Sequence, residues 1–144
     1  MLFRSQGEAI KHFGLAVRLR PQDATANNAL GASLLAAGRI GEALPYLYAA
    51  LRAQPDNFDA HYNLANTFAS QDKFVEAIEH YRAAIRLHPN DANAEANLGS
   101  ALAETGNLPE AKLHFQRALQ IDPSHKLARE NLEQISRDPK YLKQ

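Results

Sequence analysis

The chain has 144 residues, 45% of them hydrophobic, and its 16 basic and 16 acidic side chains leave no net charge. This balance argues against nucleic acid as a partner, since nucleic-acid-binding domains carry an excess of basic residues. The absence of cysteine excludes disulfides and thiolate metal sites. No apolar run approaches the roughly 20 residues that span a bilayer, and residues 1–8 lack the apolar core of a secretory signal. We therefore expect no membrane insertion and a cytoplasmic location.

A proline recurs every 34 residues, at Pro21, Pro55, Pro89 and Pro123. A fixed period of this size indicates a stack of similar units. Before each proline, an alanine, a large apolar residue and a second alanine follow one another with helical spacing, so they form one face of a helix. These triplets are Ala9, Phe13 and Ala16; Ala43, Leu47 and Ala50; Ala77, Tyr81 and Ala84; and Ala111, Phe115 and Ala118.

A second helical face follows each proline. It contains a leucine nine residues after the proline and, in three of the four cases, a small residue next to that leucine. The residues concerned are Leu30-Gly31, Leu64-Ala65, Leu98-Gly99 and Leu132. Small residues opposite large ones allow two helices to cross closely. Each period is therefore predicted to contain two antiparallel helices, which we name A and B in chain order.

In chain order, the period predicts a half repeat, three full units, a capping helix and a tail. Their bounds are 1–21 for the half repeat, with a B helix over 2–20; 22–55, 56–89 and 90–123 for the full units; 124–137 for the C-terminal capping helix; and 138–144 for the polar tail. The prolines end the B helices, because proline lacks a backbone donor and restricts the residue before it.

The breaks between the helices follow the same period. Gly38 and Gly106 lie between A and B helices, where a helix end favours a left-handed residue, and Asp72 holds the equivalent place in residues 56–89. Short polar residues after each proline are predicted to cap the next A helix. The candidates are Asp23, Asp56 or Asn57, Asn90 or Asp91, and Ser124.

This pattern resembles the tetratricopeptide repeat family, whose helix–turn–helix unit carries Leu-Gly, Ala, a large apolar or aromatic residue, Ala and Pro at set offsets. The resemblance covers about residues 8–136. The tryptophan that the family places early in each unit is replaced here by Asn27, His61 and Glu95. The resemblance implies an all-α solenoid of antiparallel helix pairs in a right-handed superhelical arc, with about eight helices.

In this family the A helices line the concave surface of the arc, and that surface commonly binds an extended peptide. The resemblance therefore implies a groove along the A helices and the capping helix. The predicted groove residues are Asn28, Asp59, Tyr62, Asn63, Asn66, Asn93, Asn97, Ser100 and Asn131, with Thr25, Ala29, Ala32, Ala96, Leu127, Glu130 and Gln134 beside them. Lysine and arginine are absent where chaperone-binding members hold a C-terminal carboxylate, so we do not expect that ligand.

Asn63, Asn97 and Asn131 recur at intervals of 34 residues, one in each successive A helix. A side-chain amide donates and accepts, so a row of them suits the backbone of a bound peptide. The row is similar to the asparagine ladder in the superhelix of the O-linked N-acetylglucosamine transferases. In the alternative interpretation, the asparagines bond neighbouring A helices or backbone and have a structural role.

The first B helix has no A helix before it, so several of its apolar residues would lack part of their cover. Terminal repeats normally carry a polar outer face. Two interpretations remain open: docking on upstream chain or on a second copy, or a frayed end helix. The residues proposed for self-association into a homo-oligomer are Phe3, Ile10, Phe13 and Val17.

No residue pattern in the sequence predicts catalysis, a cofactor or a metal site. His12, His80 and His114 share one repeat position, but equivalent positions on stacked helices lie about 10 Å apart, which is too far for one zinc ion. We expect these histidines on the surface. Charged residues of the third B helix are expected to form solvated ion pairs: Glu76, Glu79, Lys73 and Arg82.

The sequence thus predicts a non-catalytic protein-interaction scaffold that binds an extended protein or peptide segment in a neutral, amide-rich groove. Two alternatives remain open. The segment is the substrate-selecting arm of a larger enzyme such as a glycosyltransferase, or it is a self-assembling scaffold built on its first helix.

Overall fold

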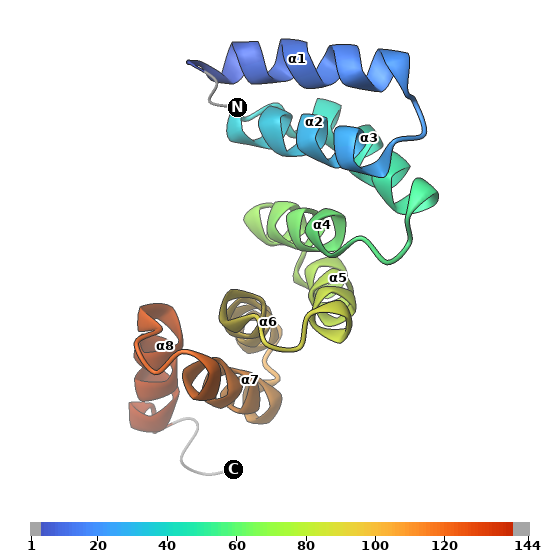
Figure 1. Cartoon of the computed structure of the whole chain (residues 1–144). Coiled ribbons are helices and arrows are strands. Elements are labelled where there is room, and N and C mark those ends of the chain that lie inside the picture. Colours follow the sequence, from blue (N-terminus) through green and yellow to red (C-terminus); the bar gives the residue numbers. More distant parts are fainter. Residues whose placement is uncertain (1–3, 140–144) are drawn as a thin grey trace. The chain divides into compact units, whose positions relative to one another are not determined.

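The computed structural model describes residues 4–139, and these residues form eight α-helices and no strand (Figure 1). The helices are α1 (Gln6–Leu19), α2 (Ala24–Ala36), α3 (Ile40–Ala53), α4 (Phe58–Ser70), α5 (Phe74–Leu87), α6 (Ala92–Glu104), α7 (Leu108–Ile121) and α8 (Lys126–Arg137). Each B helix ends two residues before its proline, as expected. None of the helices in the described part of the chain has the length and apolar character needed to cross a membrane.

The chain forms two compact units, Met1–Thr67 and Phe68–Gln144. In the first unit, α2 packs against both α1 and α3. In the second unit, α6 packs against α5 and α7, and α8 packs against α7 and α6. The A helix is thus in contact with a B helix on either side, which is the arrangement expected of stacked helix pairs.

Within a pair, the A helix contributes a glycine and the B helix a large side chain. A Cβ atom added to Gly31 would lie 2.7 Å from Cδ2 of Leu47, and one added to Gly99 would lie 2.8 Å from Cε1 of Phe115. Leu47 and Phe115 are fully buried. This interlocking of glycine and large side chain is what the spacing predicted. In α8 the equivalent position is Glu133, which is exposed and pairs with Arg137 at 3.5 Å.

The turns between A and B helices also follow the prediction. Gly38, Asp72 and Gly106 adopt positive φ values of 73°, 58° and 83°. At each of these turns the chain reverses after an A helix, and the left-handed residue directs the chain into the following B helix. Asp72 does so at a cost, because its Cβ crowds the backbone there.

Replacing Asp72 with glycine is expected to raise the free energy of unfolding by about 1 kcal/mol, since glycine adopts the left-handed conformation without steric cost. Urea denaturation followed by circular dichroism measures this change. The matched control is Gln71→Gly, one residue earlier, where φ is negative. There the glycine should lower stability by enlarging the unfolded ensemble. Equal effects at both positions would contradict the interpretation.

Three of the four N-caps agree with the sequence. The side chains of Asp23, Asn57 and Asp91 accept hydrogen bonds from the backbone N–H groups three residues later, at 3.0, 2.9 and 2.8 Å. These bonds satisfy amides that the helix itself leaves without a partner.

The prediction of Ser124 as the cap of α8 is wrong. Nδ1 of His125 accepts the hydrogen bond from the backbone N–H of Ala128 at 3.3 Å. The Ser124 hydroxyl instead donates to Oδ1 of Asp122 at 2.6 Å. Because Asp122 holds the serine side chain in the preceding turn, the following residue becomes the cap.

The first helix begins later than expected, at Gln6, because the hydroxyl of Ser5 accepts from the backbone N–H of Glu8 and caps the helix there. Three of the four residues considered for self-association, Ile10, Phe13 and Val17, are half-buried and pack against the core cluster of α2 and α3. The fourth, Phe3, lies outside the described residues. The exposed apolar residues of α1 are Leu15 and Leu19.

Candidate functional site

The A helices of the first unit, α2 and α4, are joined by two asparagines. The Nδ2 group of Asn63 donates to Oδ1 of Asn28 at 3.0 Å, and both side chains are half-buried. This bond uses one amide group from each residue. The amide N–H₂ of Asn28 and the Oδ1 atom of Asn63 make no other hydrogen bond within the described chain. If both amides were rotated by 180°, the pair would still leave one donor and one acceptor open.

The neighbouring groove residues of α4 also reach the surface. Asp59 is exposed, and Tyr62 and Asn66 are half-buried. The ring of Tyr62 stacks on that of Phe58 with a centroid distance of 5.7 Å and an interplanar angle of 13°. This stacking restricts the tyrosine, so its ring is held in place before any ligand arrives.

In the second unit the predicted groove residues have partners within the chain. Oδ1 of Asn93 accepts from Nε2 of His125 at 2.9 Å, and the Ser100 hydroxyl donates to the backbone oxygen of Ala96 at 3.1 Å. The amide of Asn131 donates to the backbone oxygen of Leu127 in its own helix at 2.9 Å. Asn97 is half-buried and also has a partner.

Ala96 was expected beside the groove, but it is fully buried. It therefore belongs to the core of the second unit. The surface between α6 and α8 is nevertheless hollowed, since a cleft of about 390 Å³ lies there. Its walls include Asn131 and Gln134, both predicted groove residues, and the carboxylates of Glu104 and Asp138.

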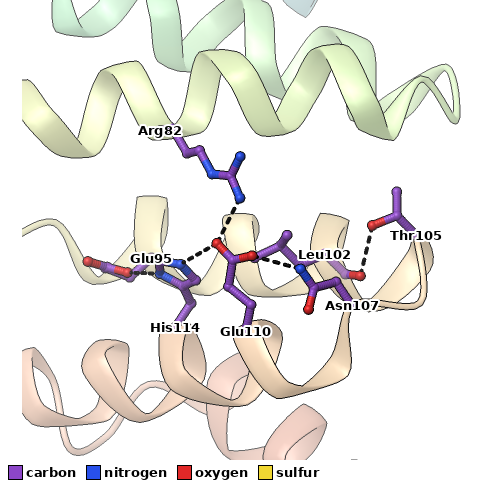
Figure 2. A network of polar contacts seen from close by, with 7 residues as sticks. All are labelled: Arg82, Glu95, Leu102, Thr105, Asn107, Glu110 and His114. Atoms are coloured by element: carbon purple, nitrogen blue, oxygen red, sulfur yellow. Dashed lines mark hydrogen bonds and ion pairs between the residues drawn. The ribbon is translucent and has the colours of Figure 1, made fainter.

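A second polar cluster, shown in Figure 2, lies among α5, α6 and α7. Nδ1 of His114 is 2.6 Å from Oε2 of Glu95, and the two residues are only 8% and 3% exposed. Nε2 of His114 also lies 3.7 Å from Oε1 of Glu110. Expecting His114 on the surface was therefore wrong, because a carboxylate on the neighbouring helix provides it with a buried partner.

The cluster continues to α5 through an ion pair. Arg82 donates from its guanidinium to Oε1 of Glu110 at 2.7 Å, and Asn107 donates to Oε2 at 2.7 Å. The hydrogen bond from Arg82 lowers the pKa of Glu110 below its ordinary value, and burial opposes this shift in part. Arg82 thus pairs with α7, across the helix stack, in place of the predicted pairing along its own helix.

Comparing the repeats explains why Glu95 turns inward. At the equivalent position, Asn27, His61 and Arg129 each lie against the carbonyl oxygen of the proline six residues earlier, at 2.9, 3.0 and 2.5 Å. A carboxylate cannot donate such a bond. Glu95 therefore bonds to His114, and the Pro89 carbonyl has no donor within the described chain.

We also examined the described residues for metal sites. They contain no group of three or more His, Cys, Asp or Glu side chains placed to hold one ion. The buried Glu95–His114 pair consequently has two members and no further ligand arranged around it.

A tetratricopeptide repeat family model matches the chain at residues 7–58, 29–92 and 62–126. No curated protein matches the sequence significantly. Among solved structures, the chain is similar to the first tetratricopeptide repeat domain of Spaghetti (RPAP3), bound to the HSP90 peptide SRMEEVD. The two are 26% identical, with a TM-score of 0.76 over 80% of this chain and 91% of that one.

Two further structures are similar to this chain. YrrB, described as a protein of the same repeat type with an unusual peptide-binding site, is 26% identical, with a TM-score of 0.78 over 89% of this chain. MamA is 26% identical, with a TM-score of 0.75 over 82% of this chain. The matched regions cover 66% of the YrrB chain and 64% of the MamA chain.

Proposed function

The chain belongs to the tetratricopeptide repeat family, and from this we propose that it is a non-catalytic scaffold that binds an extended peptide segment along its A helices. Two of the similar structures support a peptide ligand, because their descriptions name a bound HSP90 peptide and a peptide-binding site. The proposed surface consists of the groove residues of α2, α4, α6 and α8 named above.

The observation that carries the proposal is the Asn28–Asn63 pair. Its single internal hydrogen bond orients both amides and leaves one donor and one acceptor open. A peptide unit offers the complementary acceptor and donor, so the pair suits recognition of a backbone with little dependence on side chains. The internal bond and a ligand contact are compatible, and the structural and binding interpretations of these asparagines do not exclude each other.

The charge of the A helices supports the same kind of ligand. α2, α4 and α6 contain no lysine or arginine, and their acidic residues are Asp59, Glu95 and Glu104. Such a surface lacks the cations that would attract an acidic tail. We therefore expect the HSP90 peptide SRMEEVD, with its three acidic residues, to bind weakly or not at all.

The test uses a peptide-display library selected against the full chain, followed by binding measurements with the selected peptides. Replacing Asn63 and Asn97 together with alanine is expected to weaken binding at least tenfold, because each asparagine supplies contacts to the backbone. Circular dichroism should show unchanged helicity. The matched control is Gln116→Ala, an exposed amide on the B helix α7, which should bind like the wild type.

Two results would count against the proposal. If the double variant binds the selected peptides as tightly as the wild type, the asparagines do not contact the ligand. If the double variant loses its helicity, the asparagines act in the stack alone, and the structural interpretation is the correct one.

A further inference from the structure

A second cleft, of about 320 Å³, lies in the second unit where α5 and α7 end and α6 begins. Ile85 and Ile121 provide apolar walls, Pro89 belongs to the turn before α6, and the buried Glu95 and the exposed Arg117 also line it. This cleft shares no lining residue with the predicted groove, so its ligand is a separate question from the peptide proposed above.

Glu95 presents an open acceptor to this cleft. Its Oε2 atom is hydrogen bonded to His114, whereas Oε1 has no partner within the described chain. Every fully buried side-chain oxygen or nitrogen in the described chain does have a partner. Oε1 must therefore retain access to solvent, and the cleft that Glu95 lines provides that access. A carboxylate that is 97% buried as a residue thus offers one oxygen to a ligand.

The Pro89 carbonyl is a second open acceptor beside the first. In the other units a side chain six residues after the proline meets this carbonyl, and in the last unit that side chain is the guanidinium of Arg129, at 2.5 Å from Pro123. Position 95 carries a carboxylate where the other units carry a donor. The repeat therefore lacks a donor at this one place and has two acceptors there.

We propose that this cleft binds a guanidinium or ammonium group on an alkyl stem, as in an arginine or lysine side chain of a partner protein. The cationic head donates to Oε1 of Glu95 and to the Pro89 carbonyl, taking the place that Arg129 holds in the next unit. The aliphatic stem lies along Ile85 and Ile121, as the stems of long basic side chains do on apolar surface. Hydrogen bonds between a cation and a carboxylate are among the stronger ones in proteins.

Arg117 weakens this site without closing it. It lines the cleft but forms no ion pair with any residue from 4 to 139, Glu95 included. Its guanidinium repels a cationic ligand, although solvent screens this repulsion because the side chain is exposed. Removing its charge should therefore improve binding, a result that a merely structural role for Glu95 would not produce.

The experiment titrates n-butylguanidinium into the full-length, isotope-labelled chain and follows backbone amide shifts by NMR. The amides of residues 85–95 and 117–121 should shift with saturation, and n-butyrate at the same concentrations should leave them unchanged. Acetyl-Gly-Arg-Gly-amide, which presents arginine as a partner protein would, should shift the same amides.

Three variants decide the outcome. Glu95→Gln keeps an acceptor for His114 but removes the negative charge, so its affinity for n-butylguanidinium should fall at least tenfold. Arg117→Gln should bind about twofold to fivefold more tightly. Glu104→Gln, an exposed carboxylate in the other cleft, should bind like the wild type. Binding of n-butyrate, an unchanged affinity in Glu95→Gln with helicity retained, or failure of the arginine peptide to shift these amides would overturn the proposal.

Discussion

Replacing Phe115 with alanine is expected to lower the free energy of unfolding by about 3–5 kcal/mol, the cost typical of deleting a buried aromatic ring. The ring is fully buried, and it lies directly over Gly99, where an added Cβ would be 2.8 Å from the ring. A glycine has no side chain that could move into the vacated space, so the cavity should remain largely open. Urea denaturation followed by circular dichroism measures the loss.

The matched control for this prediction is Leu113→Ala on the same helix. Leu113 is 54% exposed, so its truncation should change stability by no more than about 0.5 kcal/mol. Both variants remove large apolar side chains from α7 and differ mainly in burial. If they destabilise the chain equally, the effect would come from helix propensity and the packing of Phe115 on Gly99 would not be the cause.

The second large effect concerns the Glu95–His114 pair. Replacing His114 with alanine should cost about 3–5 kcal/mol, because it leaves a buried carboxylate without its partner. Replacing both residues with apolar ones, Glu95→Leu together with His114→Phe, should recover most of this loss, since no charge then remains buried. The free energies of unfolding of the two single variants and the double variant form a double-mutant cycle that isolates their coupling.

His12→Ala is the matched control for that cycle. His12 occupies the same repeat position in α1 but is exposed, so its loss should change stability by no more than about 0.5 kcal/mol. Additive effects of the single variants at positions 95 and 114 would contradict the predicted coupling.

The helices could be predicted from the sequence because every unit repeats the same contacts. The proline spacing located the ends of the B helices, and the pairing of Gly31 with Leu47 recurs as the pairing of Gly99 with Phe115. The left-handed conformation of Asp72 followed in the same way, from the glycines at its equivalent positions. A repeated pattern constrains each position several times over, which a single irregular domain does not offer.

Burial of polar residues was harder to predict, because it depends on the partner across the interface. His12, His80 and His114 share one repeat position, yet His12 is exposed, His80 is half-buried and His114 is buried. A signal was present in the sequence: positions 19 residues apart hold His61 with His80, but Glu95 with His114. Only the latter combines an acid with a base, and it is the combination that buries both residues.

The candidate groove lies between these two cases. The recurrence of asparagine was visible in the sequence, and Asn28 and Asn63 were both predicted groove residues. Their mutual hydrogen bond depends on side-chain rotamers, which the 34-residue period does not specify. The open acceptors of the second cleft were missed for a related reason, because they arise where position 95 departs from the pattern of its repeat equivalents.

Glu133 bears on how such an array can grow by duplication of its units. A further B helix placed against α8 would bring its large side chain onto a carboxylate, where Gly31 and Gly99 receive Leu47 and Phe115. A duplicated unit inserted at Pro123, ahead of α8, avoids that mismatch and leaves the charged helix last. Lengthening from within is therefore the route open to this lineage and to an engineer who extends it.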